Sequence, residues 1–171
     1  MKKILGIFLI VWAFSMNGFS QKTGFVDTKY ILEKIPEYQA AEKEMETLSQ
    51  QWQKEIDDLY KKVEKMYKDY QAEEVLLTKD VKQQRQDAIM KEEQKAKDLQ
   101  KKRFGYNGDL FKQREEKVKP IQDRVFEAIE AISKENRLNF VFDKSGSVAL
   151  LYADPAFDYS DKVLQKLNIG K

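Results

Sequence analysis

Residues 36–70, PEYQAAEKEMETLSQQWQKEIDDLYKKVEKMYKDY, contain the pattern that decides the fold. Proline suits the first turn of a helix, where its missing N–H is not needed, and an acid follows it near the positive end of the helix dipole. Apolar side chains then recur at steps of three and four residues, at Tyr38, Ala41, Met45, Leu48, Trp52, Ile56, Leu59, Val63, Met66 and Tyr70. This spacing predicts one long helix with a coiled-coil seam along one face.

The seam has one irregularity, at Trp52. The step from Leu48 to Trp52 and the step from Trp52 to Ile56 are both four residues long. One extra residue therefore interrupts the heptads, which relaxes the left-handed supercoil and predicts a straighter arm at this level.

A second helix is predicted to return along the first. The apolar run 75–77, followed by Thr78, has the form of a helix stop and a new N-cap. The segment from there to Lys119 is about as long as the outgoing one, which favours an antiparallel hairpin over a single rod. Residues 37–119 are therefore expected to form an arm of roughly 60 Å, at 1.5 Å per helical residue.

The returning half of the arm is much less apolar than the outgoing half. Between Thr78 and Arg103 its apolar side chains are Val81, Ala88, Ile89, Met90, Ala96 and Leu99. Such a helix is not expected to seal the outgoing seam. Gly105 and Gly108 follow, and because each glycine costs a helix about 1 kcal/mol relative to alanine, a kink or hinge is expected there.

The remaining residues, 21–36 and 120–171, are expected to form one small body. Residues 23–26 are typical of a short strand, and the apolar runs 139–143 and 148–152 indicate two buried strands around a turn. Helices are expected on either side of these runs. The predicted fold class is α+β and mostly helical, a long antiparallel hairpin projecting from a small β-containing body.

This small body is expected to associate with other copies of itself. A core of this size, without disulfides, is marginal alone. The predicted strands are apolar on both faces, which calls for cover beyond two short helices. The candidate oligomerisation residues are Phe25, Val26, Phe140, Val141, Phe142, Leu150 and Leu151.

The N-terminus has the layout of a secretory signal peptide. Two lysines precede an apolar run over residues 4–14, and Gly18 and Ser20 are small enough for cleavage before Gln21. That run is too short to span a bilayer, which takes roughly 20 residues. Removal of residues 1–20 takes two of the 31 basic residues and leaves 29 acidic ones, so we expect a neutral, soluble protein in the periplasm.

The composition argues against an enzyme. The chain has no histidine and no cysteine, which removes the usual general base, the thiol nucleophile and the commonest metal ligands. The acids Asp143, Asp154, Asp158 and Asp161 lack the alternating spacing of an EF-hand and are better explained by caps and turns. We therefore expect no catalysis, no metal and no cofactor.

Charge is unevenly distributed along the arm. Residues 79–103 hold nine basic and five acidic side chains, whereas residues 37–58 hold seven acidic and two basic ones. Acids alternate with bases in the basic stretch, so binding to nucleic acid is not expected. Two interpretations stay open, chance patterning on a solvated helix and weak attraction of the basic arm tip to an anionic membrane surface or client.

Several short motifs, in this order and spacing, resemble the OmpH/Skp-like family of periplasmic chaperones over residues 22–168. They are Gly24-Phe25-Val26-Asp27 with Tyr30-Ile31-Leu32, Pro36-Glu37-Tyr38, Phe104-Gly105 with Gly108, Pro120-Ile121 followed by Ala128-Ile129, and Phe140-Val141-Phe142-Asp143. The resemblance implies a homotrimer whose bodies join through a small β-structure while three arms surround a cavity. The resemblance also implies that unfolded outer-membrane barrel proteins are held there without ATP. Familiar members are strongly basic, whereas this chain without its signal is neutral.

The expected function is therefore an ATP-independent holdase that binds clients through many weak contacts. Methionine and tyrosine on an under-filled seam make adaptable contacts that suit many sequences. The candidate client-facing residues are Tyr60, Met66, Tyr67, Tyr70, Leu76, Leu77, Ile89 and Leu99, and the hinge candidates are Gly105 and Gly108. The alternative is a structural coiled-coil scaffold or spacer of the cell envelope, for which the seam would be filled by the hairpin itself.

Overall fold

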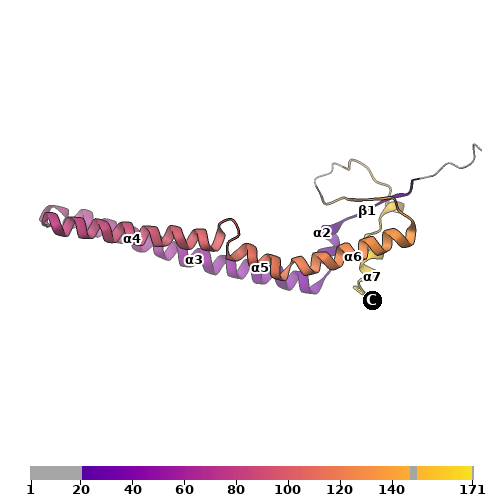
Figure 1. Ribbon diagram of the computed structural model, residues 1–171, viewed down its shortest axis with the longest axis horizontal. Helices are drawn as coiled ribbons and strands as arrows, with labels where there is room; N and C mark the ends of the chain where they lie inside the picture. Colours follow the sequence, from indigo (N-terminus) through magenta and orange to yellow (C-terminus); the bar gives the residue numbers. More distant parts are fainter. Residues whose placement is uncertain (1–20, 147–149, 171) are drawn as a thin grey trace, which may run out of the picture. The chain divides into compact units, whose positions relative to one another are not determined.

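The computed structural model describes residues 21–146 and 150–170 (Figure 1). The predicted signal peptide, residues 1–20, lies outside the described residues. The chain divides into two compact units, an arm formed by Leu32–Phe126 and a body formed by the segments on either side of it. The arm thus includes several residues that we assigned to the body from the sequence. The reason is that a helix crosses each of the two junctions between arm and body.

The arm is an antiparallel helical hairpin, as predicted. Its outgoing helix α3 (Pro36–Glu73) is unbroken over 38 residues. A 3-10 turn η1 (Glu74–Leu76) reverses the chain, and α4 (Lys79–Phe104) and α5 (Asp109–Lys117) run back along α3 (Figure 1). The turn lies where the sequence predicted it, although the Thr78 hydroxyl makes no capping hydrogen bond to α4.

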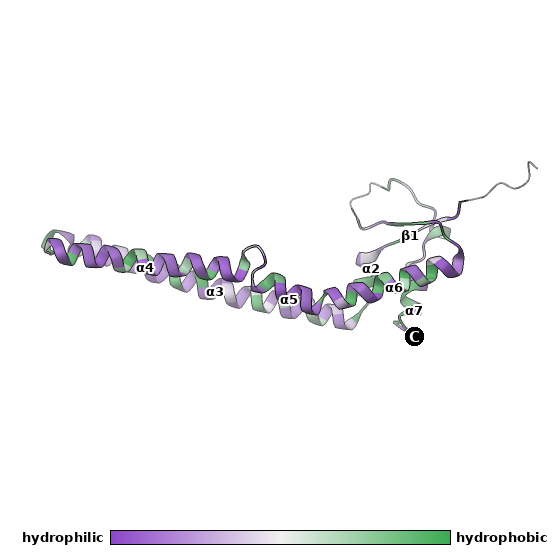
Figure 2. Ribbon diagram, in the orientation of Figure 1, coloured by the Kyte–Doolittle hydropathy of each residue, from purple (hydrophilic) through white to green (hydrophobic). Residues whose placement is uncertain are grey.

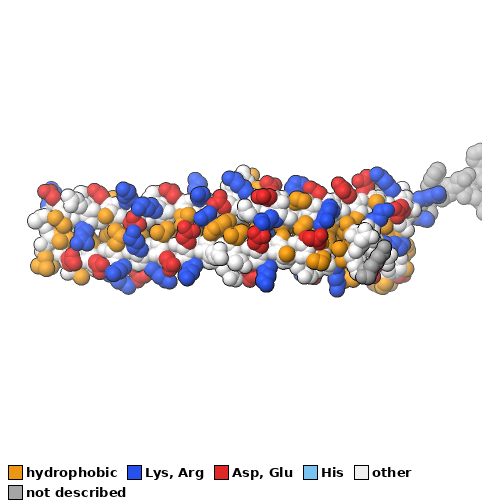
Figure 3. Space-filling model, turned by 90° about the horizontal axis from the view of Figure 1, so that it is seen from below, with side chains coloured by type: hydrophobic (Ala, Val, Ile, Leu, Met, Phe, Trp, Pro, Cys, Tyr) orange, Lys and Arg blue, Asp and Glu red, His pale blue; other side chains and the backbone are white. Residues whose placement is uncertain are grey.

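The apolar seam of α3 is the interface of this hairpin. All ten of its predicted positions, the skip at Trp52 included, are buried or half-buried, and Ile56 is only 1% exposed. Helix α4 is coloured mostly hydrophilic in Figure 2, and charged side chains cover much of the arm surface in Figure 3. The prediction that α4 would leave the seam unsealed is therefore only partly right, since the returning side covers α3 largely with polar groups.

The returning side of the hairpin is interrupted where the glycines predicted it. Helix α4 ends at Phe104 and α5 begins at Asp109, so residues 105–108 form no helix. Helix α6 (Lys119–Asn136) follows α5 and continues into the body.

The body contains a two-stranded parallel sheet. Strand β1 (Thr23–Val26) pairs with β2 (Phe140–Asp143), with Thr23 opposite Phe140 and Val26 opposite Asp143. Helix α2 (Thr28–Glu33) begins in the body after β1, and the 3-10 turn η2 (Pro155–Phe157) and helix α7 (Ser160–Lys166) end the chain. The strand at residues 23–26 is thus confirmed.

The predicted pairing of residues 139–143 with residues 148–152 is wrong. Strand β2 pairs with β1 instead, and the described part of the second run, Leu150–Tyr152, is irregular and exposed. Residues 148 and 149 lie outside the described residues. The physical reason is that the Lys144 N–H continues the parallel ladder to the Val26 carbonyl, at 2.7 Å, and Asp143 is bound to the start of α2. Residues 143 and 144 are therefore held against β1 and α2, which are far from them in the sequence.

The helix ends in the body are closed by backbone motifs. Helix α6 ends at Asn136, and Arg137 adopts the left-handed region with φ of 57°. The Leu138 N–H donates to the Ser133 carbonyl at 2.9 Å, which is the hydrogen bond of a Schellman motif. No described helix has an apolar stretch long enough to cross a membrane.

Candidate functional site

We call α4 and the part of α3 that faces it the outer half of the hairpin. In this half, α4 carries charged side chains at seam positions. Steps of four and three residues along α4 select Arg85, Ile89, Glu92, Ala96, Leu99 and Arg103. Three of these six are charged, and each forms an ion pair across the hairpin. Arg85 Nη2 lies 3.4 Å from Glu73 Oε2, and Arg103 Nη2 lies 3.4 Å from Glu55 Oε2.

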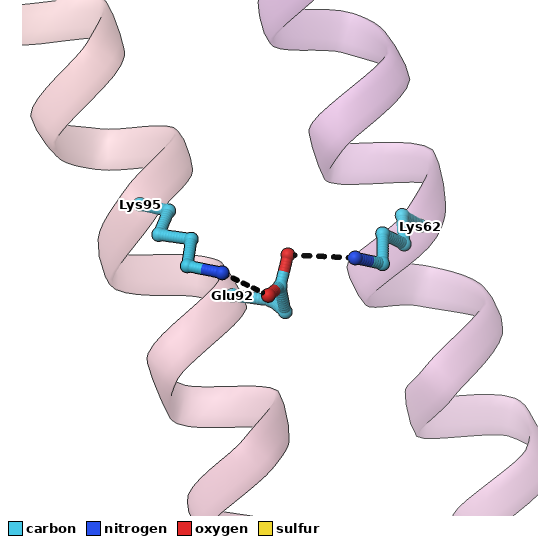
Figure 4. A network of polar contacts seen from close by, with 3 residues as sticks. All are labelled: Lys62, Glu92 and Lys95. Carbon is cyan, nitrogen blue, oxygen red and sulfur yellow. Dashed lines mark hydrogen bonds and ion pairs between the residues drawn. The ribbon is translucent and has the colours of Figure 1, made fainter.

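Glu92 is the central member of this polar seam. Its carboxylate accepts hydrogen bonds from Lys95 on its own helix and from Lys62 on α3, the latter at 3.0 Å (Figure 4). These hydrogen bonds, first that of Lys95 and then that of Lys62, hold the pKa of Glu92 below its ordinary value. The side chain is only 13% exposed, so an ionised group sits where a coiled coil ordinarily places an apolar one.

An apolar groove of about 710 Å³ opens between α3 and α4 in this outer half. Its apolar lining consists of Tyr60, Val63, Tyr67, Tyr70, Ile89 and Met90, and its polar lining of Glu64, Glu74, Gln86 and Glu93. Figure 3 shows hydrophobic side chains gathered along the line between the two helices on one face of the arm, with charged side chains on both sides. We call this feature the aromatic groove.

The walls of the aromatic groove are exposed and its floor is not. Tyr67 is 50% and Met90 57% exposed, so both offer apolar surface to a ligand. Tyr70 is 6% exposed, and its hydroxyl accepts a hydrogen bond from Gln86 Nε2 at 2.8 Å. Tyr70 therefore forms the floor of the groove and offers little surface itself, and its role as a client-facing residue stays a prediction.

The other predicted client-facing residues divide by position. Tyr60, Tyr67 and Ile89 lie in the groove with Tyr70, whereas Met66, Leu77, Leu99 and Leu76 do not line it. Met66, Leu77 and Leu99 are half-buried. Leu76 is 83% exposed, beside Val75 at the tip of the hairpin. The sequence interpretation missed Val63, Met90 and Val75. Met90 could have been found, because it follows Ile89 on a helix with few other apolar residues.

The hairpin also changes the interpretation of charge. It places the basic stretch of α4 along the part of α3 from Glu55 to Glu73, as the pairs Arg103–Glu55 and Arg85–Glu73 show. Residues 64–85, which form the tip, contain five basic and five acidic side chains. The last turns of the hairpin are therefore neutral, whereas residues 59–103 together hold 13 basic and nine acidic side chains, so attraction of the arm to an anionic surface or client stays a prediction.

The candidate oligomerisation residues of the body fall into two groups. Phe25 and Val26 are buried within the body, at 6% and 2% exposure, and are not available to a partner. Val141 is half-buried. The exposed members are Phe140, Phe142, Leu150 and Leu151. Within residues 21–146 and 150–170, no group of three acidic side chains gathers closely enough to hold a metal ion.

Comparison with known proteins agrees with this fold. No curated protein matches the sequence. The crystal structure of an OmpH-like protein from Caulobacter crescentus superposes with a TM-score of 0.66 over 87% of this chain and 85% of that chain, at 13% identity, which shows a common fold. The model of the family described as outer membrane protein (OmpH-like) matches residues 22–167. The chain therefore belongs to the OmpH-like outer membrane protein family.

Proposed function

We propose that this protein is an ATP-independent holdase of the periplasm that binds unfolded outer-membrane proteins on its helical arms and prevents their aggregation. The single observation that carries the proposal is the aromatic groove, an exposed apolar surface on an otherwise charged hairpin. Family membership supports a role with outer-membrane proteins, and the Caulobacter neighbour has been described as a candidate outer membrane chaperone.

The lining of the groove suits segments of barrel proteins. A strand of an outer-membrane barrel alternates apolar and polar side chains. Its apolar side chains can lie against Tyr67 and Met90, while its polar side chains remain among the charged groups that flank the groove. Methionine and tyrosine adapt to different shapes, so the groove accepts many sequences.

Each contact in the groove is weak, which explains release without ATP. Covering about 100 Å² of apolar surface contributes roughly 2.5 kcal/mol at 25 cal/mol per Å², and ordering the side chains costs about 0.5–1.5 kcal/mol for each. The remainder is below the 4.1 kcal/mol that corresponds to a Kd of about 1 mM. A client is therefore held by several grooves together and leaves when a better partner competes.

Several arms require several copies, and the body supports their association. Phe140 and Phe142 on β2 are 55% and 43% exposed, and Leu151 is 97% exposed. A second copy that covered these side chains would remove apolar surface from water. We propose a homotrimer, the state that the resemblance implies, with the signal peptide cleaved and the protein free in the periplasm.

A structural spacer of the cell envelope is the second candidate. It is favoured by the complete burial or half-burial of the ten seam positions on α3, since a rod requires a filled seam. It leaves the exposed Tyr67 and Met90 without a role. The two candidates differ in what happens when an unfolded client is added.

The test is suppression of aggregation, measured by light scattering when a barrel protein is diluted out of urea. The mature protein in excess is expected to keep scattering low. Tyr67→Ser with Met90→Ser should lose most of this protection, whereas the control Tyr106→Ser with Phe111→Ser, which removes two exposed aromatic rings outside the groove, should retain it. Unchanged scattering with the wild-type protein would favour the spacer.

A further inference from the structure

Near Trp52 the outgoing side of the arm is one unbroken helix, whereas the returning side is interrupted. Helix α3 runs unbroken past Trp52, while the returning side is divided into α4 and α5 by residues 105–108. These four residues form a turn in which the Gly108 N–H donates to the Gly105 carbonyl at 2.8 Å. At this level the hairpin is continuous in one helix only.

The turn is tightly packed against the end of α4. Both glycines have φ of −69°, so neither is required for a left-handed conformation. A Cβ on Gly105 would lie 2.3 Å from the Lys101 carbonyl oxygen, and one on Gly108 would lie 2.8 Å from the Lys102 carbonyl oxygen. Glycine is needed at both positions for this close approach. The turn is therefore a defined structure and not a loose linker.

The irregularity of the outgoing seam lies at the same level. Trp52, where two steps of four residues meet, packs edge-on against Phe104, with ring centroids 6.3 Å apart. The guanidinium of Arg103 lies over the Trp52 ring, 4.7 Å from its centroid. The interruption of the heptad pattern in α3 and the break between α4 and α5 therefore lie at the same level. They divide the arm into an outer segment, which contains α4, and an inner segment, which contains α5.

Arg103 connects the three helices that meet here. Its Nη1 donates to Asp109 Oδ2 at 2.7 Å, which spans the turn from the end of α4 to the start of α5. Its Nη2 reaches Glu55 on α3 at 3.4 Å. Its Nε is buried without a hydrogen-bond partner among the described residues, a cost that exposure to water would remove.

We propose that this level is a latched joint, at which the outer hairpin segment bends relative to the inner one about the continuous helix α3. Arg103 is the latch, because its contacts to Asp109, Glu55 and Trp52 hold the straight form. The aromatic groove lies wholly in the outer segment, so opening the joint would swing the groove without unfolding it. The inference goes beyond client binding and stands or falls independently of it.

The test measures the bend of α3 directly. The chain contains no cysteine, so Lys43→Cys and Lys65→Cys, both at exposed positions on either side of Trp52, can carry two spin labels. Labelled protein is diluted with an excess of unlabelled protein to suppress distances between copies. With Arg103 intact we expect one narrow distance distribution, and with Arg103→Ala we expect at least a twofold broader distribution that extends to shorter distances.

A matched control separates the latch from general loss of charge. Arg85→Ala removes an arginine that also makes an ion pair across the hairpin, to Glu73, but lies away from the joint, and it should leave the distribution narrow. Asp109→Asn, which weakens only the bridge across the turn, should broaden it and decides the matter if Arg103→Ala fails to fold. A distribution as narrow as wild type in Asp109→Asn, or a wild-type distribution already as broad as that of Arg103→Ala, would overturn the proposal.

Discussion

At the scale of single residues, Asp143 shows how a distant carboxylate organises the body. Its Oδ1 accepts hydrogen bonds from the Thr28 N–H at 3.1 Å and from the Ser145 N–H at 3.0 Å, and its Oδ2 accepts one from the Thr28 hydroxyl at 2.7 Å. Burial alone would raise the pKa of Asp143, but these hydrogen bonds outweigh burial and lower it. The ionised carboxylate thus joins the end of β2 to the first turn of α2.

Because the pKa of Asp143 is lowered on folding, its contribution to stability is present above the unfolded pKa of about 3.9 and is lost as the pH falls through the lower folded value. We predict that Asp143→Asn destabilises the protein at pH 7 by about 1–2 kcal/mol, below the roughly 1.5–3 kcal/mol of hydrogen bonds to charged groups because the carboxylate is partly exposed. Urea unfolding followed by circular dichroism measures the difference. The difference should shrink as the pH falls below the unfolded pKa of about 3.9, and a difference that stays constant on acidification would contradict the assignment.

At the scale of elements, the hairpin combines an apolar outgoing helix with a partly charged returning one. Ion pairs at partly buried positions contribute less than well-packed apolar side chains of similar volume, because the charges must give up hydration. The arm therefore holds together less firmly than a filled coiled coil, and it keeps polar groups beside the groove. Glu92, which pairs with Lys62 and Lys95, is the position at which replacing an ion pair by an apolar side chain is most easily tested.

We predict that Glu92→Leu raises the urea midpoint of arm unfolding, since leucine fits a seam position that the heptad spacing assigns to an apolar residue. Circular dichroism at 222 nm, the usual helix signal, measures this on the mature protein. The control is Glu93→Leu, the adjacent and more exposed glutamate, which should change the midpoint much less. A lower midpoint for Glu92→Leu would show that the ion pairs stabilise the hairpin more than packing would.

The elements also show what the sequence alone could predict. The limits of α3 follow from Pro36 and from a seam periodicity that is local, so they could be predicted closely. The parallel pairing of β1 with β2 could not, because it depends on contacts such as that between Thr28 and Asp143, which are 115 residues apart. The charged seam positions of α4 were missed because a count of apolar residues ignores charged ones at the same spacing. Tyr70 stands at a seam position, so its burial could be predicted from the spacing, whereas Tyr67 stands outside the seam and its contact with clients stays a prediction.

At the scale of the whole molecule, the body presents apolar surface that one copy does not cover. Phe140 and Phe142 are exposed aromatic residues of β2, one of the two strands of the small sheet. We predict that, in the protein without residues 1–20, Phe140→Ser with Phe142→Ser lowers the sedimentation mass from that of an oligomer toward that of a monomer. Phe111→Ser, which removes a similarly exposed ring from α5 in the arm, should leave the mass unchanged. A monomeric wild-type protein would contradict self-association.

If clients lie in the aromatic groove of the outer arm, as we propose, a photoreactive group placed in the groove should crosslink to them. The photoreactive residue benzoylphenylalanine replaces either Tyr67, in the groove, or Phe111, outside it; these rings are 50% and 47% exposed, so the two sites are matched. A barrel protein is diluted from urea into each variant and illuminated. We predict strong crosslinking from position 67, little from position 111, and loss of the signal once the client has folded in detergent. Equal crosslinking from both positions, or stronger crosslinking from position 111, would contradict the claim.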